Sequence, residues 1–76
     1  MLFEVKTLTG IKYKLNSSNF NTVVDIKSYL QEKEGINIKQ IRLVSCGKQL
    51  NDIALISNVI QTNMQTVHMI LALRGG

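Results

Sequence analysis

The chain has 76 residues, 45% of them hydrophobic, a length that suits one domain with a single small core and excludes two. A lone cysteine, Cys46, excludes a disulfide within the chain and favours a reducing compartment, and one cysteine with one histidine cannot fill a zinc site. The formal net charge is +4 at pH 7, but the basic residues are dispersed and not interleaved with aromatic ones, so we expect no nucleic-acid partner.

The first 17 residues predict a hairpin. Apolar and polar residues alternate over 1–7 and again over 11–17, and LTG at 8–10 supplies a turn that ends in glycine. The side chains expected on the inward face are Met1, Phe3, Val5, Ile11, Tyr13 and Leu15. This start is unlike the basic-then-apolar pattern of a signal peptide, and no apolar stretch approaches the ~20 residues of a membrane span.

A helix is predicted over residues 23–34. Thr22, followed three residues later by Asp25, is a variant of the capping box. The apolar residues that recur on one helical face are Val23, Ile26 and Leu30. Gly35 follows EKE directly and is the expected left-handed stop, because only glycine enters that conformation without a steric penalty.

The second half of the chain predicts further strands. Residues 40–45 alternate, SCGK then turns into a short edge strand, and another alternating strand covers 66–72. The stretch IALISNVI at 53–60 is compatible with a short helix or an irregular path. The order β-β-α-β-β predicts an α+β domain over residues 1–71, in which one helix packs on one face of a mixed sheet of four to five strands.

The alternation also places apolar side chains on the solvent side of the sheet. If the helix covers the face that carries Phe3, Val5, Leu43, Val67 and Met69, then Val44 and Ile70 point outward beside Lys6, Arg42 and His68. Leu8 stands at the hairpin tip, where turn chemistry alone would not select leucine. Scattered exposed apolar residues are normal, whereas a group inside a basic rim forms a patch suited to weak, transient partners.

Several motifs resemble the ubiquitin family, in register from Met1 to Gly76. They are VKTLTG at 5–10, KEGI at 33–36, RL at 42–43, GKQL at 47–50, His68 and the final LRGG. The resemblance implies a β-grasp fold. Leu2, the pair Asn51-Asp52 and the ending LALRGG are more similar to the Nedd (Rub) branch than to ubiquitin, which has arginine where Ala72 stands. In this family the activating enzymes discriminate at that position.

This resemblance implies a protein modifier and not an enzyme. Residues 72–76 would form a flexible conjugation tail, in which Gly75 and Gly76 leave the terminal carbonyl accessible. An activating (E1-type) enzyme would adenylate Gly76 with ATP, and conjugating (E2-type) and ligase (E3-type) enzymes would pass it as a thioester to target lysines, mainly of cullins. Deconjugating proteases would remove it. The residues assigned to activating-enzyme recognition are Leu71, Ala72, Leu73 and Arg74.

The same resemblance assigns six residues to a partner-binding patch. The patch residues are Leu8, Val44, Ile70, His68, Arg42 and Lys48. Lys48 also matches a lysine used for chain building, so it is a candidate acceptor. Neither His68 nor Cys46 has the neighbours of a catalytic residue, and we expect no cofactor and no metal. We expect a cytoplasmic and nuclear monomer.

The chain departs from the family in places. Asn37-Ile38 replaces a Pro-Pro pair, and residues 53–65 match poorly, which leaves their path open while Ile60 is expected to be their apolar anchor. Ser17 stands where the family has a core aliphatic residue, and we hypothesise that Phe20 fills that space. Two other interpretations stay open: a divergent ubiquitin for protein tagging and degradation, and a non-covalent ubiquitin-like binding domain.

Overall fold

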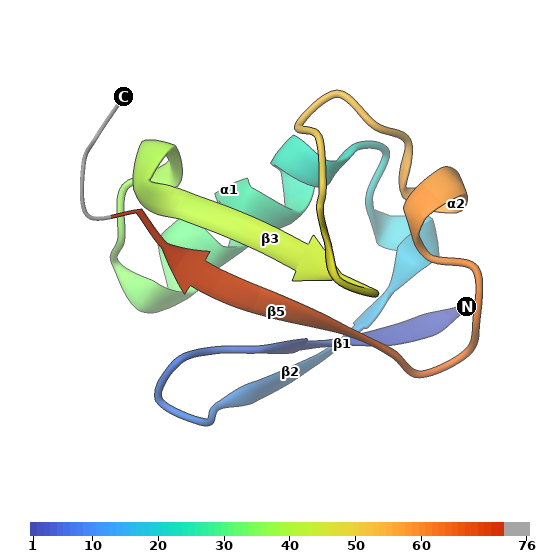
Figure 1. Cartoon of the computed structure of the whole chain (residues 1–76), viewed down its shortest axis with the longest axis horizontal. Coiled ribbons are helices and arrows are strands. Elements are labelled where there is room, and N and C mark those ends of the chain that lie inside the picture. The colour runs from blue at the N-terminus through green and yellow to red at the C-terminus, as the bar shows by residue number, and fades with distance from the viewer. Residues whose placement is uncertain (73–76) are drawn as a thin grey trace.

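The computed structural model describes residues 1–72 and shows one mixed sheet of five strands crossed by a long helix (Figure 1). The strands are β1 Leu2–Lys6, β2 Lys12–Asn16, β3 Ile41–Ser45, β4 Lys48–Gln49 and β5 Gln65–Leu71. The helices are α1 Val23–Glu34 and the short α2 Ile56–Val59, with single 3-10 turns η1 Ser17–Asn19 and η2 Ile38–Gln40. The predicted α+β, β-grasp class is confirmed.

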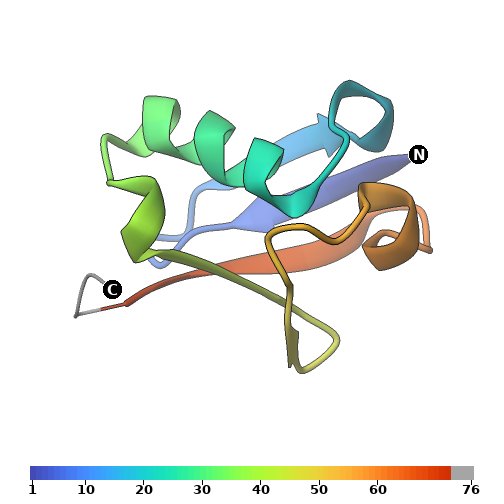
Figure 2. The same ribbon diagram turned by 90° about the horizontal axis from the view of Figure 1, so that it is seen from above.

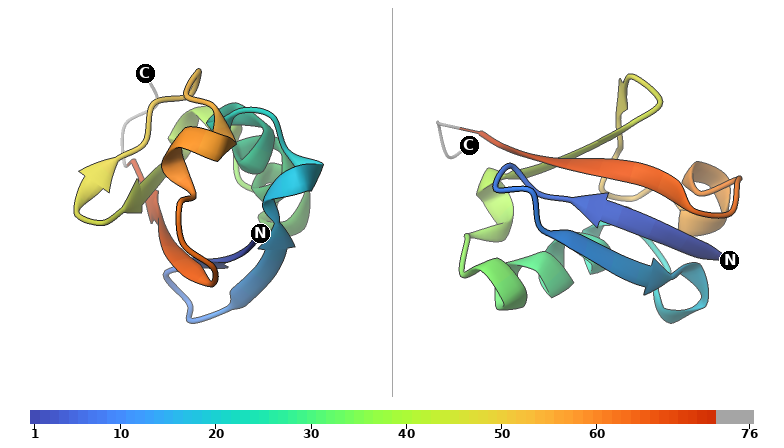
Figure 3. Two further views of the ribbon diagram at one scale, coloured as in Figure 1. Left: turned by 90° about the vertical axis from the view of Figure 1, so that its right-hand side faces the viewer. Right: turned by 90° about the horizontal axis from the view of Figure 1, so that it is seen from below.

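The sheet has the strand order β2-β1-β5-β3-β4. β1 and β5 are parallel neighbours at its centre, and the pairs β1-β2, β5-β3 and β3-β4 are antiparallel. Figure 2 shows α1 lying along one face of this sheet while the other face carries no helix, and Figure 3 shows the same two layers from other sides. The first and last strands of the chain therefore lie side by side and position the functional surface.

The core lies between α1 and the sheet. Its buried members are Phe3, Val5, Leu15, Val23, Ile26, Leu30, Ile41, Leu43, Leu50, Ile56, Ile60, Val67 and Met69. The expected inward positions of Met1 and Ile11 are wrong: these side chains are 53% and 46% exposed. Both residues lie just outside the ends of β1 and β2, so the alternation that orients the strand interior does not bury them.

The helix begins and ends where its local signals predict. The Asp25 carboxylate accepts hydrogen bonds from the backbone N–H groups of Thr22 (3.1 Å) and Asn21 (2.9 Å). Gly35 closes the helix with φ of 68°, and its N–H donates to the Gln31 carbonyl. These contacts satisfy backbone groups that an α-helix leaves unpaired at its ends, so residues 23–34 form the helix.

The segment that sequence pattern left open forms the single turn α2. The Ile56 N–H donates to the Asn21 carbonyl and the Val23 N–H donates to the Ala54 carbonyl, so this segment is tied to the start of α1. Ile60 is 4% exposed, which confirms it as the apolar anchor. Long-range hydrogen bonds, not local pattern, therefore define this part of the fold.

Candidate protein-interaction surface

The register of the sheet gathers five of the six predicted patch residues on or beside its open face. Val44 on β3 lies opposite His68 on β5, and Arg42 lies opposite Ile70. Opposite residues share a face, and these four side chains are exposed or half-buried while their strand neighbours are buried, apart from the half-buried Leu71. The parallel pairing of β1 and β5 then adds Lys6, which lies opposite His68.

Leu8 completes an apolar hollow beside these strands. It lies in the turn between β1 and β2 and is 67% exposed, and Ile70 is 41% exposed. A hollow lined by Lys6, Leu8, Val44, His68 and Ile70 connects the turn with β3 and β5. An apolar floor with a cationic margin can bury leucine-like side chains of a partner and hold its carboxylates at the edge. We call this set the Leu8–Ile70 patch.

Lys48 is not brought together with the Leu8–Ile70 patch. It lies directly opposite Ser45, whose side chain is 3% exposed and donates to the Thr66 carbonyl at 2.9 Å, so Lys48 shares the helix side of the sheet. It lines a different hollow, together with Cys46 and Val59. The signal was available: Cys46 and Gly47 form a two-residue hairpin loop, which places the flanking residues opposite each other.

Two residues outside the six predicted patch residues, Lys6 and Ile36, also line hollows beside Leu8. Lys6 was expected beside the patch, and the parallel β1-β5 pairing makes it part of the hollow wall. Ile36 follows the helix and lines a smaller, mostly apolar hollow with Leu8 and Leu71. This hollow therefore lies beside Leu71, the last residue of β5.

The described chain remains attached to the body through Ala72. Leu71 is half-buried and pairs with Ile41, and the Ala72 N–H donates to the Gln40 carbonyl at 2.7 Å. The predicted recognition residues Leu73 and Arg74 and the conjugation residues Gly75 and Gly76 lie outside the described residues.

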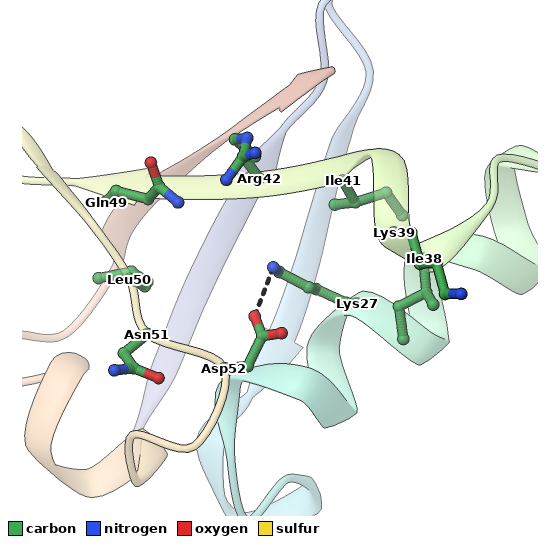
Figure 4. A pocket seen from close by; sticks show the side chains of 9 residues that line it. All are labelled: Lys27, Ile38, Lys39, Ile41, Arg42, Gln49, Leu50, Asn51 and Asp52. Atoms are coloured by element: carbon green, nitrogen blue, oxygen red, sulfur yellow. Dashed lines mark hydrogen bonds and ion pairs between the residues drawn. The ribbon is translucent and has the colours of Figure 1, made fainter. Parts of the chain in front are cut away.

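A further hollow lies between α1 and the β3-β4 edge (Figure 4). Its lining includes Lys27, Lys39, Arg42, Gln49 and Asp52. Figure 4 shows the Lys27 side chain directed at Asp52, and their charged atoms are 2.5 Å apart. The Lys27 side chain is only 8% exposed, whereas that of Asp52 is 55% exposed. The buried Lys27 amine is therefore held in an ion pair with Asp52 and is poorly placed to act as an acceptor lysine for conjugation.

Neither a metal-binding group of side chains nor a membrane-spanning helix is found within residues 1–72. No group of three histidine, cysteine or acidic side chains in this part of the chain could hold a metal ion. No helix in it has the length and apolar character to cross a membrane.

A five-stranded mixed sheet with one long helix on one face, and an apolar patch with cationic neighbours on the other, defines a ubiquitin-like domain. The chain belongs to the ubiquitin family, whose model, described as "Ubiquitin family", matches residues 3–74.

Full-length relatives place the chain beside Nedd and Rub proteins. It is 38% identical to "NEDD8-like protein RUB1" of Saccharomyces cerevisiae, over 100% of this chain and 99% of the relative. It is 40% identical to "Ubiquitin-like protein NEDD8" of Dictyostelium discoideum, with the same two coverages. It is 41% identical to "Ubiquitin-like protein 1" of Schizosaccharomyces pombe, over 100% of this chain and 97% of the relative. The resemblance to the Nedd (Rub) branch is confirmed.

Proposed function

We propose that this chain is a post-translational modifier of the Nedd type, joined through Gly76 to lysines of target proteins. The observation that carries the proposal is the match to NEDD8 and RUB relatives over the whole chain and nearly the whole of each relative. That match spans both the folded body and the LALRGG ending.

The proposed chemistry uses the chain as the transferred group and not as the catalyst. A carboxylate is a poor acyl donor, so ATP first converts the Gly76 carboxylate to an acyl adenylate with release of pyrophosphate. An enzyme cysteine displaces AMP and forms a thioester. The ε-amine of a target lysine then attacks the thioester carbonyl and releases the thiol, which leaves an isopeptide bond. The absence of a β-carbon at Gly75 and Gly76 favours each attack sterically.

Ala72 supports the Nedd branch over a divergent ubiquitin. Its backbone is held at the end of β5 by the hydrogen bond to Gln40, so its small side chain has a defined position on the body. An activating enzyme with an apolar pocket at this position accepts alanine and rejects arginine, because a guanidinium would lose its solvent there without gaining partners. The reverse holds for an enzyme built around arginine.

The proposed partners follow from this role. Activating, conjugating and ligase enzymes would carry the modifier, cullins would receive it, and deconjugating proteases would release it. After conjugation, the Leu8–Ile70 patch would engage the ubiquitin-ligase machinery that contains the cullin. The protein would act as a monomer in the cytoplasm and nucleus.

A charging assay tests the proposal. The chain is mixed with ATP and either a purified Nedd-type or a purified ubiquitin-type activating enzyme, and a thiol-sensitive adduct is sought on gels. We expect charging by the Nedd-type enzyme and, for Ala72→Arg, a loss of about tenfold or more, since an unpaired buried charge costs at least ~1.4 kcal/mol. Deletion of Gly75 and Gly76 is the negative control. Charging by neither enzyme would leave the non-covalent binding domain, and preference for the ubiquitin-type enzyme would establish the divergent ubiquitin.

A further inference from the structure

The β1-β2 hairpin carries two lysines, Lys12 and Lys14, that lie outside the Leu8–Ile70 patch and beside its member Lys6. Lys6 on β1 and Lys12 and Lys14 on β2 are exposed on the face of the sheet opposite α1. Of the acidic side chains in residues 1–72, only Glu4 lies on this face; the others lie on α1 or in the loop after β4. The hairpin therefore presents three ammonium groups and one carboxylate.

The positions of these lysines lower the stability of the sheet. Lys6 and Lys12 lie directly opposite each other in the antiparallel pair, a position where like charges destabilise a sheet. Glu4 lies opposite Lys14, its Oε1 is 3.8 Å from the Lys12 Nζ, and its side chain is only 15% exposed. One partly covered carboxylate cannot neutralise three ammonium groups. A surface that keeps such a repulsion is preorganised for an anionic partner.

The lysine group is continuous with the Leu8–Ile70 patch. Lys12 lies opposite Lys6, Lys6 opposite His68, and His68 opposite Val44, so these four residues form one row across four adjacent strands. Three steps between neighbouring strands span about 14 Å. That distance equals about four residues of an extended peptide. A single short segment can reach both the apolar hollow and the lysines.

We propose that Lys6, Lys12 and Lys14 form a second half of the recognition surface, which binds an acidic segment of the same partner protein whose apolar side chains enter the Leu8–Ile70 patch. The inference rests on the proposed function only in that it concerns the same surface. Charge complementarity selects the partner: carboxylates of glutamate or aspartate meet the ammonium groups, while leucine-like side chains fill the hollow. Because these contacts lie at an exposed rim, they act mainly on the association rate and depend on salt.

A protein partner fits this face better than a nucleic acid. The aromatic residues Phe3, Tyr13, Phe20 and Tyr29 contact one another on the helix side of the sheet, so none of them is available on the open face to stack on bases. The apolar hollow beside the lysines also has no counterpart in a phosphate backbone.

The test measures binding of a short peptide in which leucines precede a run of glutamates, followed by NMR amide shifts on the whole chain. The matched control peptide has glutamine for each glutamate. We expect shifts at both the hollow and the β1-β2 hairpin. The variant with Lys12→Glu and Lys14→Glu should bind about five- to tenfold more weakly. Lys33→Glu, which removes a cation from α1 beside Tyr29, should bind as the parent does.

Two further measurements, a salt series and a comparison with nucleic acid and lipid, determine which kind of partner binds. Peptide binding should weaken between low salt and about 1 M salt, where the Debye length falls from ~30 to ~3 Å. Equal binding of the glutamate and glutamine peptides, or of the parent and the double variant, would overturn the inference. Tighter binding of a single-stranded oligonucleotide or of anionic phosphatidylserine vesicles would overturn it as well. The charging assay is independent: normal charging with no acidic-peptide preference refutes this inference alone, and the converse result refutes conjugation alone.

Discussion

Phe20 offers a sharp test of how this small core is completed. The centroid of its ring lies 6.1 Å from that of Phe3 and 6.0 Å from that of Tyr29, and both contacts are edge-to-face. Ser17, in the 3-10 turn that ends at Phe20, contributes no apolar surface. The half-buried Phe20 ring therefore links the buried Phe3 to the outer edge of α1.

The expected cost of Phe20→Ala follows from these contacts. Truncating a fully buried phenylalanine costs about 3–5 kcal/mol, and a half-buried one costs roughly half of that. Each edge-to-face pair adds about 0.5–1.5 kcal/mol beyond burial. With two such pairs, we expect a total loss of about 2.5–5.5 kcal/mol. A domain of this length has an unfolding free energy of roughly 4–11 kcal/mol, so the loss is a large fraction of its stability.

Urea denaturation followed by circular dichroism measures the effect. Phe20→Leu is the control, because it keeps most of the apolar volume and loses the ring contacts, and it should cost about 1 kcal/mol. A double-mutant cycle with Tyr29→Leu should give a coupling of about 0.5–1.5 kcal/mol. If Phe20→Ala unfolds within ~0.5 kcal/mol of the parent, a range typical of surface sites, Phe20 does not complete the core.

Two further predictions concern carboxylates that contact other groups within the domain, Asp52 and Asp25. Asp52→Ala should lower the free energy of unfolding, measured in urea, by about 2–3 kcal/mol, because it leaves the buried Lys27 ammonium without its partner. Lys27→Met should lower it by less than ~1 kcal/mol, because it removes the buried charge itself. A larger loss for Lys27→Met than for Asp52→Ala would contradict this account. Hydrogen bonds from the N–H of Thr22 and then of Asn21 lower the pKa of Asp25 below its ordinary value of 3.8. This stabilisation is present above about pH 4 and is lost as pH falls through the lower folded pKa, so melting temperatures should drop there in the parent and less in Asp25→Ala.

Elements with local signals could be predicted from sequence. The helix bounds depend on groups within a few residues of its ends, Asp25 at the start and Gly35 at the close, so the prediction of residues 23–34 is confirmed. The path of 53–60 depends on hydrogen bonds between Ile56 and Asn21 and between Val23 and Ala54, which join segments about thirty residues apart. No periodicity within eight residues contains that information.

The apolar residues of the candidate surface could be predicted from the sequence, whereas its charged residues were predicted only in part. Alternation alone puts Val44 and Ile70 outside once the helix face is known. The neighbours of these residues depend on strand order and register, which alternation does not determine. Lys6 was expected on the outward side, and the parallel pairing of β1 with β5 places it directly opposite His68. The two-residue loop before Lys48 pairs that residue with Ser45, on the other face.

The two faces of the sheet therefore have different roles, one in stability and the other in partner binding. Residues directed at α1 supply the buried area that stabilises the domain, whereas the open face keeps a like-charged pair, Lys6 and Lys12, that lowers stability. Reversing the charge of Lys12 exchanges the repulsion from Lys6 for an attraction, and the attraction to Glu4, whose Oε1 is 3.8 Å from the Lys12 Nζ, for a repulsion. The net effect on stability should therefore be small, whereas the binding of acidic partners should weaken. A Lys12→Glu protein that melts near the parent temperature and loses acidic-peptide binding would separate the two roles directly. If it lost both stability and binding, the lysine would be a structural residue, and the open face would not be a surface shaped for partners.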